Sequence, residues 1–314
     1  MRLLVTGAAG FIGSHLAESL MADGHDVVGI DCFTDYYDTS LKEENARGLE
    51  VRRSDLAEDD LDFAGFDGVF HLAGQPGVRS FGGVFPVYLR RNILASQHVF
   101  EAAAREGVKV VFASSSSVYG AAERYPTPED TTPHPLSPYG ITKLACEHLA
   151  DAYRRQFGLD CVVLRYFNAF GPRQRPDMAF TRIALALAEG GRFELFGDGT
   201  QSRSWTYVGD IVDATVTALR GNGTYNVGGA LEASMNEAIA LFESVAGAKL
   251  DIVRHEEPVA GDQRRTRADT TRIRDEFGWA PRVSLADGIR AQWDWASAEV
   301  RIRNATALPK RNPH

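Results

Sequence analysis

Tyr139 and Lys143 form a Tyr-x-x-x-Lys pattern that can move a proton. On a helix, side chains four residues apart lie on one face, so the lysine charge would lie beside the phenol. Ser137 fits a helix N-cap and Pro138 the first helical position, which places Tyr139 in the first turn, at the positive end of the helix dipole. Both influences favour the phenolate, which accepts a proton. The pattern predicts general-base catalysis by Tyr139.

Four serines, Ser114 to Ser117, follow an apolar segment that we predict to be a strand. A hydroxyl at this strand end could bind the oxygen of a reacting alcohol and share its proton with Tyr139. Taken alone, a serine run also suits a loop, and Tyr-x-x-x-Lys occurs by chance in many helices. In the sequence, both motifs follow a glycine turn and an acidic residue at a strand end. Four such features in this order would rarely occur together by chance.

Three glycines, Gly7, Gly10 and Gly13, are spaced Gly-x-x-Gly-x-x-Gly between a predicted strand and a predicted helix. Glycines allow a tight turn and let the backbone approach a pyrophosphate, while the helix N-terminus presents free N–H groups. Gly13 also lets helix and strand pack closely. We therefore expect a dinucleotide site that includes Phe11 and Ile12 of the same turn.

Asp31 ends the second predicted strand, where its carboxylate can accept both hydroxyls of an adenosine ribose. The same carboxylate would repel a 2′-phosphate, so NAD is favoured over NADP. Asp55 and Leu56 follow the third predicted strand, where an adenine edge would lie. The fourth strand ends in small residues that let the backbone approach the cofactor. They belong to the segment Leu72, Ala73 and Gly74.

Short apolar runs alternate with longer amphipathic stretches through the first half of the chain, which is typical of a parallel sheet covered on both faces. The predicted strands are 3–6, 26–30, 50–53, 68–72, 108–113 and 161–165, and the predicted helices are 13–23, 87–106 and 139–157. The pattern loosens from about Asn168. There we predict helices at 179–189, 235–246 and 285–297 and strands at 193–196, 224–227 and 250–253.

The predicted fold class is α/β, a Rossmann doubly wound parallel sheet with a smaller α/β C-terminal substrate domain. Residues 1–167, with about 203–228, would form the NAD-binding domain. Residues 168–202 and 229–314 would form the substrate domain.

The composition of the chain excludes several classes of binding partner. The chain has 314 residues and a formal net charge of -8, which argues against a nucleic-acid backbone or an anionic membrane as the main partner. Cys32, Cys146 and Cys161 show no zinc-ligand spacing, so no metal site is expected. No signal peptide or membrane span is expected at the start of the chain. We therefore predict a reduced, cytoplasmic protein.

Together these motifs resemble the extended short-chain dehydrogenase/reductases that act on nucleotide sugars, over roughly Arg2 to Ala296. The resemblance implies a Rossmann domain with tightly bound NAD, a C-terminal nucleotide-sugar domain and usually a homodimer formed through two helices per subunit. It implies that Tyr139 is the base, that Lys143 binds the nicotinamide ribose, and that Ser115 assists. Ser116 is a possible substitute within the serine run.

Three stretches, 35–38, 75–80 and 175–179, resemble UDP-glucuronate 4-epimerases within that family. The resemblance places Arg175 at the sugar carboxylate, a task that suits a bidentate guanidinium. Arg79 is a second candidate, and Ala179 ends the third stretch. A solvated loop arginine is the alternative explanation for Arg175.

Further resemblances concern the UDP moiety. The stretch 193–199 is similar to a uracil-binding strand, in which the backbone of Glu194 and Phe196 would bind the base, with Arg192 as a nearby cation. Arg203 matches a phosphate-binding arginine and Asp262 a ribose contact. An arginine common before this ribose segment is missing, so Arg264 or Arg265 would supply the charge.

The family's reactions begin alike: Tyr139 takes the proton of the C4 hydroxyl as hydride passes from C4 to NAD. Dehydration is disfavoured, because Ser115 is followed by Ser116 and Ser117 rather than by an acidic pair. We predict epimerisation of a UDP-sugar, with UDP-glucuronate and UDP-galacturonate as substrate and product. UDP-glucose/UDP-galactose epimerisation stays open because Asn168 fits it. UDP-glucuronate decarboxylation and a non-enzymatic NAD sensor are further alternatives.

Overall fold

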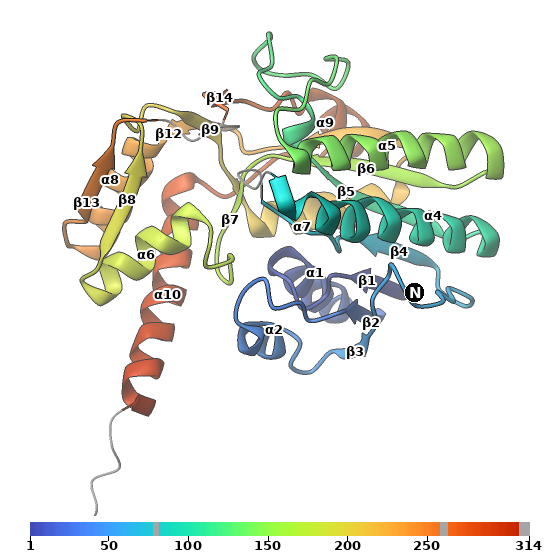
Figure 1. The fold of residues 1–314 in the computed structure, drawn as a ribbon, viewed down its shortest axis with the longest axis horizontal. Helices are drawn as coiled ribbons and strands as arrows, with labels where there is room; N and C mark the ends of the chain where they lie inside the picture. The colour runs from blue at the N-terminus through green and yellow to red at the C-terminus, as the bar shows by residue number, and fades with distance from the viewer. Residues whose placement is uncertain (78–81, 258–262, 308–314) are drawn as a thin grey trace, which may run out of the picture.

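A seven-stranded parallel sheet forms the centre of the molecule (Figure 1). The computed structural model describes residues 1–77, 82–257 and 263–307, with side chains as far as residue 302. The strand order is β11-β6-β5-β4-β1-β2-β3. The strands are β1 (Arg2–Thr6), β2 (Asp26–Asp31), β3 (Glu50–Arg53), β4 (Gly68–His71), β5 (Lys109–Ser115), β6 (Cys161–Tyr166) and β11 (Gly223–Val227). The order reverses between β1 and β4, so the predicted doubly wound Rossmann sheet is confirmed.

Both faces of this sheet are covered, which explains the unbroken apolar runs in its strands. Leu3 and Val5 of β1 pack under α1 (Phe11–Ala22), α7 (Val208–Thr217) and α9 (Thr271–Phe277). Leu4, between them, points to the other face, under α4 (Ala95–Glu106) and α5 (Pro138–Phe157). Each strand therefore contributes to two cores.

Helix boundaries follow local signals. Ser137 caps α5 by accepting a 3.1 Å hydrogen bond from the N–H of Gly140, and Pro138 occupies the first helical position, as predicted. The expected helix at 87–106 is interrupted. It comprises α3 (Phe85–Tyr88), the wider turn η2 (Leu89–Leu94) and α4.

A second, smaller core lies beside the sheet, around α6 (Ala179–Glu189), α8 (Met235–Ala246) and α10 (Leu285–Ala307) (Figure 1). The parallel pair β8 (Arg192–Phe196) and β13 (Asp251–His255) packs against these helices. The boundaries of α6 and α8 match the predicted ones, whereas α10 continues well past residue 297. Ile273 and Trp279 pack in the core of the large sheet, although their stretch was predicted for the smaller domain.

Several short elements had no sequence signal. They are α2 (Thr39–Asn45), β7 (Ala169–Phe170), β9 (Ser202–Ser204), β10 (Thr206–Tyr207), β12 (Glu232–Ser234), β14 (Arg265–Thr266), η1 (Gly82–Val84), η3 (Ser116–Val118) and η4 (Ala218–Arg220). None of the helices that the structure describes is long and apolar enough to cross a lipid bilayer.

Candidate active site

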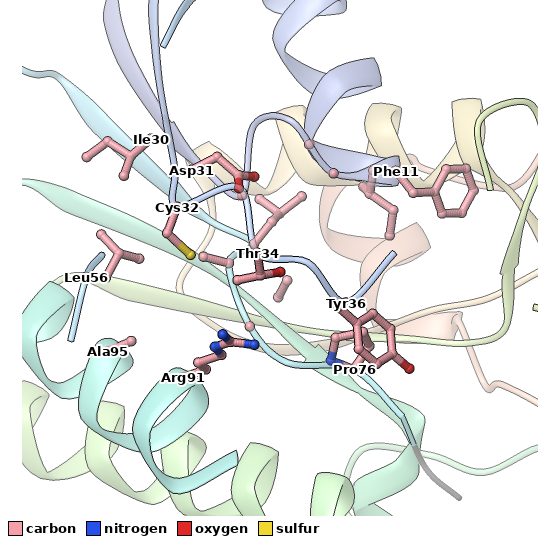
Figure 2. A pocket seen from close by; sticks show the side chains of 18 of the residues that line it. Phe11, Ile30, Asp31, Cys32, Thr34, Tyr36, Leu56, Pro76, Arg91 and Ala95 are labelled. Atoms are coloured by element: carbon pink, nitrogen blue, oxygen red, sulfur yellow. The ribbon is translucent and has the colours of Figure 1, made fainter. Parts of the chain in front are cut away.

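One cavity of about 220 Å³ lies at the carboxyl ends of the central strands, where an open α/β sheet binds ligands. It gathers every residue predicted for the cofactor: Gly7, Gly10, Phe11, Ile12, Gly13, Asp31, Asp55, Leu56, Leu72, Ala73, Gly74, Tyr139 and Lys143. Figure 2 shows Phe11 entering from the start of α1, with Arg91 and Ala95 coming from the helical segment across the cavity.

The glycine turn is packed too closely for any other residue. Gly7 has a φ of +71°, and a Cβ there would lie 2.9 Å from the backbone nitrogen of Ala73. A Cβ on Gly13 would lie 2.1 Å from the carbonyl oxygen of Gly7. The turn therefore presents bare backbone at the N-terminus of α1, and this cradle fits the pyrophosphate of a dinucleotide.

Asp31 is buried at the end of β2 and already organises the turn. Its carboxylate accepts hydrogen bonds from the N–H groups of Ala9 at 3.2 Å and Phe33 at 2.8 Å. The ammonium of Lys42 lies 3.9 Å from the same carboxylate and donates a 2.9 Å bond to Thr34. Burial lowers the pKa of Lys42. Asp31, which is labelled in Figure 2, and Lys42 thus place a carboxylate and an ammonium together in the cavity wall.

The Tyr-x-x-x-Lys pair faces the same cavity from the first two turns of α5. Lys143 is 4% exposed, and its ammonium donates a 2.8 Å hydrogen bond to the carbonyl oxygen of Ala113. The ammonium also lies 4.8 Å from the ring centroid of Phe112. A phenol and a buried ammonium therefore share one cavity wall, which is the arrangement that general-base chemistry needs.

Only part of the serine run lines the cavity. Ser114 lines it and donates its hydroxyl hydrogen to Glu147. Ser115 and Ser116 are buried but are not among the residues that line it. The hydroxyl of Ser115 accepts a 3.1 Å bond from the N–H of Ser117 and so caps the turn η3. The roles predicted for Ser115 and Ser116 stay predictions.

Of the residues predicted for the substrate, Arg175 also lines the cavity. Its guanidinium forms a two-point ion pair with Asp177, with Nε 3.0 Å and Nη2 3.1 Å from the carboxylate oxygens. Ala179 begins α6 a few residues later. Arg79 and Asp262 lie outside the described residues.

Two more predicted cations lie on adjacent strands of the small sheet β12-β9-β14, where Arg203 is opposite Thr266 and Arg265 is opposite Ser202. Arg203 of β9 is buried, and Arg265 of β14 is ion-paired with Glu232. Asn168, which has a φ of +32°, donates a 2.7 Å hydrogen bond to the hydroxyl of Thr266. Arg203, Arg265 and Asn168 therefore belong to one neighbourhood.

The strand predicted to bind uracil is β8, on the smaller core. The ring of Phe196 stacks on His255 of β13 with 4.6 Å between centroids, and His255 also pairs with Glu194. Arg192 is mostly exposed and pairs with Asp251.

Several cavity residues were not predicted as site residues, among them Thr34, Tyr36, Tyr37, Lys42 and Arg91. The two tyrosines lie in a stretch that entered only as part of the family resemblance. Lys42 and Arg91 are single cations on helical segments, and no local motif marks such residues. Within the described ranges, no cluster of His, Cys, Asp and Glu could hold a metal ion.

Comparison with known proteins agrees with the family and the cofactor that the sequence predicts. Residues 3–228 match the model of the NAD dependent epimerase/dehydratase family. The chain belongs to this family. The family and the NAD dependence expected from the glycine turn and Asp31 are therefore confirmed.

The names of individual relatives refer to more than one sugar. The chain is 42% identical to an uncharacterized UDP-glucose epimerase of Bacillus subtilis, over 92% of this chain and 96% of the relative. It is 33% identical to a UDP-glucuronate 4-epimerase of Thermodesulfobacterium geofontis, over 95% and 97%. A crystal structure of UDP-glucuronic acid 4-epimerase from Bacillus cereus, in complex with UDP-glucuronic acid and NAD, superposes with a TM-score of 0.92. That comparison has 39% identity and covers 95% of this chain and 100% of the other.

Proposed function

We propose that this protein is an NAD-dependent UDP-sugar 4-epimerase that interconverts UDP-glucuronate and UDP-galacturonate. The observation that supports this choice is the position of Arg175, which lines the same cavity as Tyr139 and Lys143. A guanidinium close to a general base suits a sugar that carries a carboxylate. The similarity to UDP-glucuronate 4-epimerases over 95% of the chain agrees with it.

The cavity fits NAD, because the bare glycine backbone suits the pyrophosphate and Asp31 suits the adenosine ribose. Asp55 and Leu56 would border the adenine, and the backbone of Leu72, Ala73 and Gly74 would follow the other half. NAD, when bound, supplies a hydride acceptor and donor for C4 of the sugar.

The chain's own residues handle the proton. Tyr139 removes the proton of the C4 hydroxyl as that carbon is oxidised, and returns it as the carbon is reduced. Lys143 stabilises the phenolate by its charge. Ser115 is the proposed hydrogen-bond partner of the C4 oxygen, with Ser116 as its neighbour in the run. A 4-keto sugar that turns over between the two proton transfers leaves as the C4 epimer.

Arg175 would also protect the substrate. A 4-keto sugar acid loses carbon dioxide when its carboxylate turns perpendicular to the carbonyl plane, and a two-point guanidinium contact opposes that rotation. Asn168, Arg203 and Arg265 would bind the remainder of the nucleotide sugar. Glu194 and Phe196 would bind its uracil. We retain Arg79 as the second candidate for the carboxylate and Asp262 as a ribose contact. Arg192 and Ala179 remain proposed substrate-binding residues.

A UDP-glucose/UDP-galactose 4-epimerase is the second candidate. Asn168 and the 42% identity to a UDP-glucose epimerase favour it. The two candidates differ in whether Arg175 has a carboxylate to bind.

We also propose a homodimer. Large apolar side chains are exposed along the α3–η2 segment and along α5, which are neighbours in the fold. They are Val87, Leu89, Leu94, Ile141 and Phe157. Burying them between two copies would remove apolar surface from water. A cytoplasmic location stays a prediction.

Incubating the purified protein with UDP-glucuronate and with UDP-glucose, without added NAD, tests the function. We expect UDP-galacturonate from the first, with little UDP-galactose from the second. Efficient conversion of UDP-glucose alone would establish the second candidate. Release of carbon dioxide with formation of a UDP-pentose would identify a decarboxylase, and binding of NAD without turnover would identify a sensor.

A further inference from the structure

The segment between β7 and α6, residues 171–178, is fastened to both parts of the molecule. Arg173, which has a φ of +61°, reaches α1 and makes a two-point ion pair with Glu18, at 2.6 and 2.7 Å. The next residue, Gln174, is 2% exposed, and its side-chain amide oxygen Oε1 accepts a 2.9 Å hydrogen bond from the side-chain amide of Gln292 on α10. The side chains of the two residues before Arg175 therefore tie this segment to α1 and to α10.

The guanidinium of Arg175 is held in turn by Asp177. The contacts use the Nε and Nη2 atoms of Arg175. Within the described part of the chain, Nη1 on the opposite edge has no hydrogen-bond partner. Of these two residues, only Arg175 lines the cavity. Asp177 thus binds one edge of the Arg175 guanidinium, and the N–H groups of Nη1 on the other edge remain available to a ligand.

Asp177 has a second contact, with Tyr36, a residue that lines the cavity. The hydroxyl of Tyr36, on the segment that follows β2, donates a 3.3 Å hydrogen bond to Oδ2 of Asp177. Tyr36 lines the cavity, and burial together with the neighbouring carboxylate raises its pKa, so it stays a hydrogen-bond donor. The carboxylate of Asp177 therefore links Arg175 to Tyr36, on the segment that follows Asp31.

We propose that Asp177, held by Tyr36, is a positioning residue that orients Arg175 and so determines specificity for a sugar carboxylate. The inference rests on the proposed function. An arginine on a flexible stem loses side-chain entropy when it binds, and a prior two-point contact reduces that loss. Alignment, rather than charge alone, then distinguishes an acidic sugar from a neutral one.

Asp177→Asn tests this, because it keeps the size of the side chain and removes the second charged acceptor. We expect kcat/KM for UDP-glucuronate to fall ~10-fold, and the inhibition constant of UDP, which has no sugar, to change less than about twofold. Asp177→Glu should recover part of the loss, and Tyr36→Phe should produce a smaller loss. The matched control is Asp275→Asn, which breaks the exposed local pair of Arg274 and Asp275 on α9, outside the cavity. It should change neither constant.

The outcomes separate the two proposals. If the wild-type protein forms no UDP-galacturonate, the proposed function fails and the inference fails with it. If the wild-type protein does form it, an unchanged or raised kcat/KM in Asp177→Asn overturns the inference alone. Equal losses in UDP affinity and in UDP-glucuronate turnover also overturn it, because they indicate a general disturbance of the fold.

Discussion

Lys143 donates a 2.8 Å hydrogen bond to the carbonyl oxygen of Ala113 and so ties helix α5 to the carboxyl end of β5. Ala113 comes directly before the serine run, and both residues of the bond line the cavity. The bond fixes a buried ammonium at the point where two predicted catalytic motifs meet. Tyr139 lies one turn earlier on the same helix, so the same contact holds the helical turn that carries its phenol.

Tyr139→Phe should retain NAD and lose turnover by about 1,000-fold, because the ring still fills its place but no longer accepts a proton. NAD retention is measured from the nucleotide released on denaturation, and turnover from chromatography of UDP-sugars. Tyr153→Phe is the matched control, since Tyr153 lies on the same helix but away from the cavity. Near-normal activity of Tyr139→Phe would exclude this residue as the base.

Asp31→Ala should weaken NAD binding by at least tenfold and reduce the preference for NAD over NADP. The substitution removes the carboxylate that would repel a 2′-phosphate and leaves Lys42, whose ammonium lies 3.9 Å from that carboxylate, to attract one. Dissociation constants for both dinucleotides give the preference. In the double variant with Lys42→Met, the gain toward NADP should disappear. An unchanged NAD/NADP ratio in the single variant would contradict the assigned role.

Gly13→Ala should prevent α1 from packing on the glycine turn, because its Cβ would lie 2.1 Å from the carbonyl oxygen of Gly7. We expect a loss of bound NAD and a destabilisation of about 1–3 kcal/mol, the usual cost of overpacking. Chemical denaturation and NAD content measure the two effects. The control, Gly191→Ala, places its Cβ at an ordinary 3.8 Å from Ala186. A Gly13→Ala protein that binds NAD normally would show that the turn adapts.

The cofactor half of the site was predictable because its physical requirements are local. Gly13 must lack a side chain and Asp31 must end a strand, and both facts appear as residue types at fixed spacing. Lys42 was not predictable, because it reaches Asp31 from the short helix α2, which has no apolar periodicity. A single lysine on such a segment has the same local pattern as a solvated one.

The substrate half was less accessible to prediction for a related reason. Its strands β7, β9, β10, β12 and β14 contain two or three residues each, too few for a period-two pattern. The pairing of β9 with β14 places Arg203 opposite Thr266, the residue that follows Arg265, although these residues are far apart in the chain. The hydroxyl of Ser115 shows a further limit, because the predicted helper caps a turn in the structure. Motif spacing finds the residue type but not its hydrogen bonds.

We expect His71 to make the folded protein less stable in acid. Its ring is buried between Thr6 and Ser96, with hydrogen bonds of 2.8 Å at Nδ1 and 2.9 Å at Nε2. Burial, with a smaller contribution from the charge of Lys143, lowers the pKa of His71 to about 3. In the unfolded chain the ring titrates near pH 6.5. Below that pH the unfolded state binds a proton that the folded state excludes, so stability falls as the pH drops from about 6.5 toward 3.

The expected contribution is about 1.4 kcal/mol for each pH unit below 6.5. Urea unfolding at pH 7, 6 and 5 should therefore give a steeper loss of stability for the wild-type protein than for His71→Gln, which cannot titrate. His15 is present in both proteins and does not affect the difference, although its pKa is also lowered, to about 4. His134→Gln, at an exposed position, serves as the control and should keep the wild-type slope. If His71→Gln follows the wild-type curve, the buried imidazole is not the group that links acid to unfolding.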